Sequence, residues 1–349
     1  MKYPEKVGIA SIDDFAEVID VRSPAEFTDD HVPGAISAPV LSNDERAKIG
    51  TLHKQASPFD AKKAGAALVS RNIATHLETL FAGRQRDWRP LVYCWRGGKR
   101  SGAMAHILRE IGWHASSLEG GYKAYRTGVL AQLAELPGRF SFRVICGETG
   151  SAKSRLLEAL DAEGAQVLDL EQLASHKGSL LGGLPGRPQP AQRMFESMVW
   201  HKLRHFDPSK PVFVESESKK VGQVQVPDAL ILAMRAADCI HIETELASRV
   251  AFLIGDYAHF LADASSLRDR LNCLVELHGR EVIARWNAAI EAGDWTTLVA
   301  DLLQNHYDPA YRKSMPKNYR RFEQADSLRP ADLTPEGIRQ AAKRLLSTT

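Results

Sequence analysis

The sequence predicts an α/β protein of two domains, each built on a parallel β-sheet, with a helical C-terminal part. Two observations support this prediction. Short apolar runs alternate with segments of helical apolar spacing up to about residue 245, a pattern typical of parallel strands covered by helices on both faces. A Leu-Pro-Gly break at residues 136–138 separates two such regions. We therefore expect domains over 1–136 and 137–349, the second helical from about residue 245.

The first domain is expected to contain short buried strands joined by helices. Ser23 and Pro24 are typical of a helix start, as the N-cap and the first helical residue. Further helices are expected over 60–80, 101–112 and 122–136. The expected strands are EVIDV (17–21), the end of HVPGAISAPV (31–40), LVYC (91–94) and the start of HASSLEGG (114–121).

The second domain repeats the alternation after the break. Helices are expected directly after Lys153, over 191–203 and over 227–237. The Gly/Pro-rich segment GSLLGGLPGRPQP (178–190) is expected to be a functional loop or lid. The expected strands are FSFRVIC (140–146), 166–170, PVFVES (211–216) and CIHIE (239–243).

Composition limits the class of protein. The chain of 349 residues is 44% hydrophobic and 25% charged, without an apolar run of the roughly 18 residues that span a membrane. Its first residues lack the apolar segment of a signal peptide, so we expect a cytoplasmic protein. The net charge of +2 permits a nucleic-acid partner only where basic residues cluster. The four cysteines form no CxxC pair and are expected to be free thiols: Cys94, Cys146, Cys239 and Cys273.

The segment LVYCWRGGKRSG places a cysteine between a strand and a helix. Backbone N–H groups and a helix N-terminus converge there, which favours a bound anion and a thiolate at Cys94. Arg100 is spaced to reach back over the anion. The alternative is a buried structural cysteine. The predicted anion-binding loop comprises Trp95, Arg96, Gly97, Gly98, Lys99, Arg100 and Ser101.

A second loop, GETGSAKS, lies between a strand and a helix and follows the P-loop pattern G-x-x-x-x-G-K-[ST], except that Ala152 replaces the second glycine. Alanine is tolerated there at negative φ and costs about 1 kcal/mol at positive φ. Lys153 would contact terminal phosphates and Ser154 a metal ion. The alternative is a tight turn without a ligand. The predicted phosphate-binding residues are Gly147, Glu148, Thr149, Gly150, Ser151, Ala152, Lys153 and Ser154.

Two acidic pairs and one basic cluster complete the candidate sites. Asp169 with Glu171, and Glu215 with Glu217, follow strands and are candidate Mg²⁺ ligands. The alternative is surface carboxylates that pair with Lys219 and Lys220. A nucleic-acid-binding surface is expected at a basic cluster interleaved with Tyr307, Tyr311 and Tyr319, and the alternative is a solvated helical face. The basic residues are Arg312, Lys313, Lys317, Arg320 and Arg321.

The first domain resembles the rhodanese family over about residues 5–135. IDVRSPAEF, HVPGAISAP and the position of Cys94 carry the resemblance. The loop from Cys94 to Arg100 is one residue longer than in many sulfurtransferases and is similar in width to that of phosphatases on the same fold. Tyr93 stands where those phosphatases have histidine. The wider loop implies a tetrahedral anion such as phosphate or selenophosphate.

Over about residues 5–270 the chain resembles the bacterial tRNA 2-selenouridine synthase family, which joins a rhodanese domain to a P-loop domain. The motifs are YCWRGGKRS, LEGGYKAYR, GETGSAKS, LDLEQLASHKGSLLGGLPGRPQP and VESESKKVG. The resemblance implies conversion of wobble 2-thiouridine in tRNA to 2-selenouridine. Selenophosphate would donate selenium, and geranyl diphosphate would first supply a geranyl group that makes sulfur a better leaving group.

The resemblance assigns roles to the two loops. Cys94 would carry selenium while its loop binds the departing phosphate, and the P-loop would bind the prenyl diphosphate. A pocket for the geranyl chain is required, and we expect the 178–186 segment to contribute to it. No tightly bound cofactor and no membrane partner are expected, and Mg²⁺ is a candidate metal.

Other functions remain compatible with these residues. A rhodanese-type sulfurtransferase or phosphatase with a regulatory P-loop domain would act on thiosulfate or phosphate esters without tRNA. A kinase or NTPase would depend on Lys153 and not on Cys94. A binding protein would be indifferent to loss of Cys94.

Overall fold

The computed structural model describes residues 4–179, 181–184, 186–258, 260 and 263–347. The chain forms two compact units, Met1–Gln132 with Ala191–His201, and Leu133–Pro190 with Lys202–Thr349. The segment Ala191–His201 lies within the sequence range expected for the second domain but packs with the first unit. Among the described residues no helix has the length and apolarity needed to cross a membrane.

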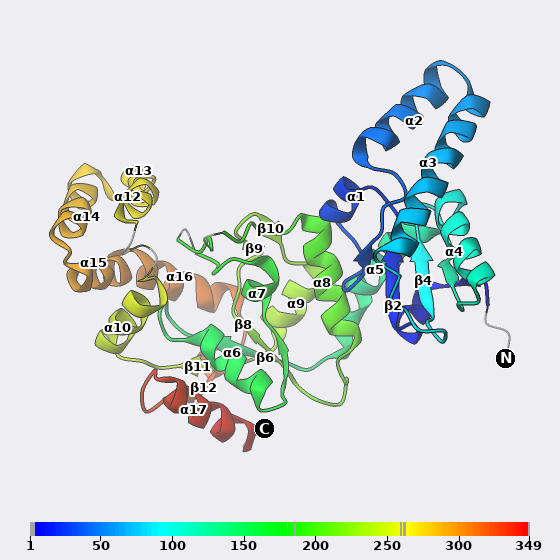
Figure 1. The fold of residues 1–349 in the computed structure, drawn as a ribbon. Helices are drawn as coiled ribbons and strands as arrows, with labels where there is room; N and C mark the ends of the chain where they lie inside the picture. Colours follow the sequence, from blue (N-terminus) through cyan, green and yellow to red (C-terminus); the bar gives the residue numbers. More distant parts are fainter. Residues whose placement is uncertain (1–3, 180, 185, 259, 261–262, 348–349) are drawn as a thin grey trace. The chain divides into compact units, whose positions relative to one another are not determined.

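The first unit contains a parallel sheet in the order β1-β5-β4-β2-β3. Figure 1 labels two neighbouring strands of this sheet, β2 and β4. Val18 pairs with Leu91 and Ile19 with Val92, so the two most apolar runs form its centre. This confirms the predicted parallel α/β class. The strands are β1 (Lys6–Val7), β2 (Glu17–Asp20), β3 (Ile36–Ser37), β4 (Pro90–Tyr93) and β5 (Ser116–Leu118).

Helices cover this sheet because their apolar residues recur on one face. Ile73, Met104 and Leu108 pack against the strands in one core cluster. On α5 and α8, Tyr125 and Trp200 meet edge to face at 5.5 Å. The helices are α1 (Pro24–Asp29), α2 (Asn43–Gln55), α3 (Pro58–Glu78), α4 (Lys99–Ile111), α5 (Gly121–Glu135) and α8 (Gln192–Arg204).

Helix α2 is absent from the sequence-based expectations. Its start carries a capping box, in which the Ser42 hydroxyl accepts from the Glu45 N–H at 3.1 Å and the Glu45 carboxylate accepts from the Ser42 N–H at 2.8 Å. No residue of α2 is buried. The apolar periodicity that reveals the other helices is therefore missing, and the S-x-x-E pattern was the available signal.

The second unit contains a parallel sheet in the order β12-β11-β6-β8-β7 and a separate two-stranded hairpin. Leu156 and Leu160 on α6, with Ile338 on α17, pack against Ile145 and Ile240 of the sheet. The strands are β6 (Phe142–Cys146), β7 (Gln166–Leu168), β8 (Val212–Glu215), β9 (Lys220–Val221), β10 (Val224–Gln225), β11 (Asp238–Ile242) and β12 (Asp326–Leu328).

Most of the second unit's helices follow residue 245, but the expectation of a wholly helical end is wrong. Residues 326–328 form β12, which pairs in parallel with β11 at the sheet edge. Three residues are too few to show a strand periodicity. The helices are α6 (Lys153–Ala162), α7 (Leu170–Ala174), α9 (Asp228–Ala236), α10 (Leu246–Asp256), α12 (Ala264–Asn272), α13 (Val275–His278), α14 (Arg280–Ala292), α15 (Trp295–Leu302), α16 (Asp308–Asn318) and α17 (Pro335–Ser347).

Four shorter helical segments connect these elements. Three are 3₁₀ turns, and the fourth is a π-helical segment that joins α15 to α16 without a break. The 3₁₀ turns are Ile9–Asp14, Leu136–Arg139 and Phe322–Gln324, and the π-helical segment is Leu303–Tyr307.

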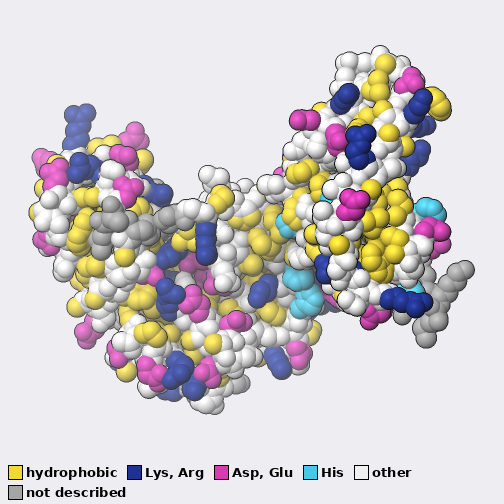
Figure 2. All heavy atoms as spheres, viewed as in Figure 1, with side chains coloured by type: hydrophobic (Ala, Val, Ile, Leu, Met, Phe, Trp, Pro, Cys, Tyr) yellow, Lys and Arg dark blue, Asp and Glu magenta, His cyan; other side chains and the backbone are white. Residues whose placement is uncertain are grey.

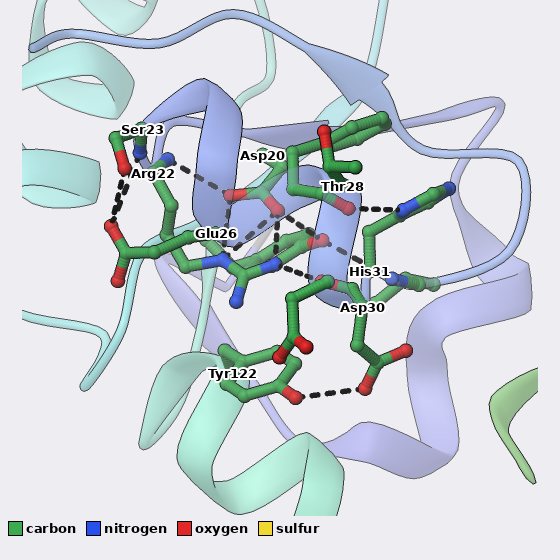
Figure 3. A network of polar contacts seen from close by, with 12 residues as sticks. Asp20, Arg22, Ser23, Glu26, Thr28, Asp30, His31 and Tyr122 are labelled. Atoms are coloured by element: carbon green, nitrogen blue, oxygen red, sulfur yellow. Dashed lines mark hydrogen bonds and ion pairs between the residues drawn. The ribbon is translucent and has the colours of Figure 1, made fainter. Parts of the chain in front are cut away.

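A buried ion pair fixes the end of β2 in the first unit (Figure 3). The Arg22 guanidinium donates to both carboxylate oxygens of Asp20 and lies over the Tyr122 ring, with Cζ 3.9 Å from the ring centroid. Tyr93 donates its hydroxyl hydrogen to Asp20 at 2.7 Å and accepts from the Val32 N–H at 3.2 Å. Tyr93 therefore supports the sheet beneath Cys94.

Two glycines let the loop after Cys94 cross the start of α5. Gly97 has φ +60°, and a Cβ there would lie 2.4 Å from the Leu118 carbonyl oxygen. Gly121 has φ +59°, and its Cβ would lie 2.2 Å from the Cys94 carbonyl oxygen. Side chains do not fit at either position, so both glycines are required for this backbone crossing.

Replacement of Gly97 by alanine is expected to lower the free energy of unfolding by about 2 kcal/mol or more, because it combines left-handed strain with a backbone clash. Gly102 is the matched control: it lies in α4 with nothing within 4 Å of an added Cβ. Gly102→Ala should raise the free energy of unfolding by about 0.5–1 kcal/mol through helix propensity. Urea unfolding of both variants measures these changes. Equal changes in the free energy of unfolding would contradict the close backbone approach described for Gly97.

Candidate functional site

Cys94 ends β4 and its sulfur faces the start of α4. Its Sγ accepts hydrogen bonds from the Ser101 hydroxyl at 3.2 Å and from the Gly98 N–H at 3.4 Å. Burial opposes ionisation of this thiol, but those hydrogen bonds, with the N–H groups of Ser101 and Arg96, outweigh burial and lower the pKa of Cys94. The geometry therefore favours a nucleophilic thiolate.

The cations of the cysteine loop differ in their surroundings. Arg96 and Lys99 are exposed. Arg100 lies with its Nη1 3.6 Å from a carboxylate oxygen of Glu26, in an ion pair at the start of α1. The predicted reach of Arg100 toward an anion thus competes with Glu26, whereas Arg96 and Lys99 are available from solvent.

The phosphate-binding loop of the second unit joins β6 to α6, as its sequence predicts. Ala152 takes the left-handed conformation, with φ +60° and ψ +33°. This is the strained alternative for the residue that replaces glycine, at a cost of about 1 kcal/mol. Strain of this kind is retained where the surrounding structure enforces the loop geometry.

Lys153 and Ser154 take up the positions expected of a P-loop. The Lys153 ammonium donates to the carbonyl oxygens of Gly147 at 2.8 Å and Glu148 at 3.4 Å. The Ser154 hydroxyl donates to a Glu171 carboxylate oxygen at 2.7 Å. Both side chains line a polar cleft together with three other cationic side chains. These are Arg155, Lys177 and Arg187.

The four predicted carboxylates gather beside this loop because β7 and β8 are adjacent and end at the same edge. The Glu215 carboxylate is buried and accepts from the Glu171 N–H at 2.9 Å. Asp169 accepts from the Gln172 N–H at 2.7 Å and caps α7. The alternative of surface carboxylates paired with lysines is wrong for Glu215, and Lys219 pairs with Asp228 at 2.9 Å.

Burial and repulsion between neighbouring carboxylates raise the pKa values of these four carboxylates. Burial, with the negative charge of Glu171, raises the pKa of Asp169 to about 6 and that of Glu217 to about 8. Burial also raises the pKa of Glu171 and Glu215. A nearby cation would relieve such a shift. Within the described residues, however, no three carboxylate, histidine or cysteine side chains are placed to hold a metal ion by themselves.

Arg249 ties the phosphate-binding loop to the helices behind it. Its guanidinium is buried and forms two hydrogen bonds of 2.8 Å with the Asp308 carboxylate. It also donates to the Thr149 carbonyl oxygen at 3.1 Å and pairs with Glu148 at 3.1 Å. These contacts hold the loop against α10 and α16.

An apolar pocket opens beside the polar cleft. Its walls come mainly from α10, α15 and the π-helical segment, and among the described residues Thr149 and Ser179 line it at its border with the cleft. Thr149, Ser179, Leu253 and Tyr257 line both spaces. The other lining residues are Leu181, Ile254, Phe260, Leu267, Trp295, Leu298, Val299, Leu302, Leu303 and Tyr307.

The basic cluster predicted to bind tRNA differs from the expectation in the ion pairs of two arginines and in the roles of two tyrosines. Its five basic residues are exposed, but Arg312 pairs with Glu148 and Arg321 with Asp238. Tyr319 is 2% exposed and donates to the Glu217 carbonyl oxygen at 2.8 Å, so stacking of a base on its ring is excluded. The Tyr311 hydroxyl accepts from the Gly147 N–H at 2.6 Å. Both tyrosines support the P-loop domain.

Sequence patterns did not identify Arg249, Asp308 or the walls of the apolar pocket. These residues lie on amphipathic helices, where inward-facing side chains normally form a core. The helical spacing alone gives no signal that distinguishes a pocket from a core. The 178–186 segment was expected to line the pocket: Ser179 and Leu181 do so, and Leu180 and Pro185 lie outside the described residues.

Replacement of Ser101 by alanine is expected to raise the pKa of Cys94, because it removes a hydrogen bond that stabilises the thiolate. At pH 7 a smaller fraction of Cys94 would be thiolate, and its alkylation by iodoacetamide would slow. Peptide mass spectrometry between pH 5 and 9 measures this rate for Cys94 alone. Ser70→Ala, an exposed position on α3, is the control. An unchanged pH profile in Ser101→Ala would contradict the assigned role.

Comparison with known proteins agrees with both units. Residues 8–127 match the family model of the rhodanese-like domain, and residues 140–275 match that of the tRNA 2-selenouridine synthase AAA domain. These matches, with the two parallel sheets, confirm a rhodanese-like domain followed by a P-loop-like α/β domain.

Several relatives carry the name tRNA 2-selenouridine synthase. The protein of Nitrosomonas europaea is 37% identical over 69% of this chain, and the match spans 63% of that relative, less than two thirds of its length. The protein of Shewanella denitrificans is 32% identical over 84% of this chain and 87% of its own. That of Alcanivorax borkumensis is 35% identical over 84% and 88%. With two domain models matched in order and relatives aligned over most of their length, the chain belongs to the tRNA 2-selenouridine synthase family.

Proposed function

We propose that this protein converts wobble 2-thiouridine in tRNA to 2-selenouridine, through an S-geranyl intermediate made from geranyl diphosphate and with selenophosphate as the selenium donor. The name of the relatives supports the overall conversion. The single observation that carries the geranyl step is the continuity between the phosphate-binding cleft and the apolar pocket.

A prenyl diphosphate needs a cationic site joined directly to an apolar one. The cleft supplies Lys153 and Arg187 for the diphosphate, together with Arg155 and Lys177, which both pair with Asp256, and the N-terminus of α6 adds its positive end. The adjoining pocket offers Leu253, Val299 and other apolar side chains for the hydrocarbon chain. A nucleotide would instead place a polar base and ribose against these walls.

The transfer itself follows from this placement. The sulfur of 2-thiouridine attacks C1 of the geranyl group, a carbon–sulfur bond forms, and the carbon–oxygen bond to diphosphate breaks. Lys153 and the loop N–H groups stabilise the charge that develops on the departing diphosphate. If Mg²⁺ takes part, Ser154 and Glu171 would hold it together with the phosphate oxygens, and the raised pKa values of the neighbouring carboxylates favour such a cation.

The selenium step is assigned to the cysteine loop. Its thiolate, the exposed cations Arg96 and Lys99 and the amides before α4 suit a small tetrahedral anion such as selenophosphate. The substrate tRNA would meet the protein through phosphate contacts, for which Lys313, Lys317 and Arg320 are exposed candidates. We expect no tightly bound cofactor.

The two loops are expected to act in separable steps. Cys94→Ala should retain S-geranylation and lose formation of 2-selenouridine, because prenyl transfer needs the diphosphate site and not the thiolate. Lys153→Ala should slow geranylation about tenfold to a hundredfold through loss of a charge-assisted hydrogen bond. Nucleoside mass spectrometry on 2-thiouridine tRNA, with each donor omitted in turn, measures both steps. Unchanged 2-thiouridine with the folded wild-type protein would refute the proposed function.

The apolar pocket predicts a donor-specific defect. Val299→Asn places a polar amide of similar volume among the pocket walls and should weaken geranyl diphosphate binding about tenfold, with little effect on inorganic diphosphate. Lys153→Ala should weaken both ligands. Isothermal titration calorimetry distinguishes the two cases. Ala300→Ser, a half-buried position on the same helix that does not line the pocket, is the control. Equal loss of both ligands in Val299→Asn would contradict the assignment of the pocket.

A further inference from the structure

The hairpin formed by α2 and α3 projects from the sheet of the first unit (Figure 1). Its base is fixed: the Asn72 amide donates to the Val40 carbonyl oxygen at 3.0 Å, and His76 Nε2 lies 3.0 Å from the Pro39 carbonyl oxygen. At the other end, which we call the hairpin tip (residues 48–63), Ala61 is the only buried residue. The tip therefore adds little to the core of the unit.

The hairpin tip carries concentrated positive charge. It has four lysines and one acidic residue, Asp60, and all five side chains are exposed. In the part of the chain that the structure describes, no ion pair neutralises any of these lysines. Lysine and arginine side chains lie along this hairpin in Figure 2. The lysines are Lys48, Lys54, Lys62 and Lys63.

An aromatic ring lies on the same helix face as two of the lysines. Phe59 is 73% exposed, the highest value among the large apolar side chains described as exposed. Positions 59, 62 and 63 are related by i, i+3 and i+4 in α3, so their side chains project from one face. A ring held in water beside two ammonium groups suits an unstacked base whose flanking phosphates the lysines contact.

We propose that the hairpin tip is an RNA-binding surface, on which Lys62 and Lys63 contact phosphates and Phe59 stacks on an unpaired base. This inference rests on the proposed function, since it assigns a further surface, besides Lys313, Lys317 and Arg320, that contacts the tRNA substrate. An acidic protein partner fits less well, because a protein interface needs an apolar core of several side chains and the tip offers one large apolar group.

The test measures binding of the full-length protein to 2-thiouridine tRNA by fluorescence anisotropy over a range of salt concentrations. Lys62→Gln/Lys63→Gln should raise Kd about tenfold near 0.1 M salt and reduce the slope of log K against log salt by about 1.5, the loss of two phosphate contacts. Phe59→Ala should raise Kd about fivefold or more and leave the salt slope unchanged.

Matched controls separate these effects from damage to the fold. Lys62→Arg/Lys63→Arg keeps the charge and should keep both Kd and slope, and Phe59→Tyr keeps a stacking ring. Lys210→Gln removes an exposed lysine of the second unit and should leave tRNA affinity unchanged. Geranyl diphosphate binding should remain at the wild-type level in all variants.

The inference is overturned if Lys62→Gln/Lys63→Gln and Phe59→Ala both keep the wild-type Kd and the wild-type salt slope. That outcome would leave the proposed function intact. Failure of the wild-type protein to modify tRNA would instead count against the proposed function. Retained affinity in Lys62→Arg/Lys63→Arg, with loss in the glutamine variant, would support phosphate contacts at the tip.

Discussion

The buried guanidinium of Arg249 connects the phosphate-binding loop to the helices that form the apolar pocket. It bonds in bidentate fashion to Asp308 and donates to the carbonyl oxygen of Thr149. Arg249 lies on α10, one turn before the pocket residue Leu253, and Asp308 follows the π-helical segment that also lines the pocket. A buried charge needs its partner, so loss of the Arg249 side chain would leave the buried Asp308 carboxylate without its bidentate partner, at a cost of about 3–5 kcal/mol. This ion pair therefore fixes the border between the polar and the apolar part of the site.

The two loops are stabilised by different physical means. At Cys94 the opposing effects are burial, which disfavours the thiolate, and hydrogen bonds from Ser101 and the backbone, which stabilise it. At the P-loop the cations are flexible side chains, and the backbone is held in a conformation that an alanine adopts only under strain. The cysteine loop uses glycines instead, because the approach of Gly97 to the Leu118 carbonyl oxygen leaves no space for a side chain. Each loop follows a strand of a parallel sheet, and the contacts at the end of that strand determine the conformation of the loop.

The polar cleft and the apolar pocket of the second unit share part of their walls. A P-loop alone indicates a bound phosphate, and an apolar pocket alone indicates a hydrocarbon. Their shared walls at Thr149, Ser179, Leu253 and Tyr257 are the observation from which we propose one ligand with both properties. Burial is the main reason for the raised pKa values of Glu215 and Glu217 beside this loop, and the negative charges of neighbouring carboxylates add to it.

The sequence by itself determined the α/β class, the two loops and the family, because each depends on local patterns: apolar periodicity, glycine and lysine at fixed spacing, and a strand before a helix. It also placed Cys94 correctly after a strand and Lys153 correctly at the start of a helix. Only the tertiary structure brought Glu215 beside Glu171, buried Tyr319 within the P-loop domain, and formed the apolar pocket from α10 and α15. These features join residues distant in sequence, and helix periodicity does not distinguish a side chain that faces a core from one that faces a ligand. Two local elements were also not predicted. The edge strand β12 is too short to show an apolar period, and the helix α2 is too exposed to show one.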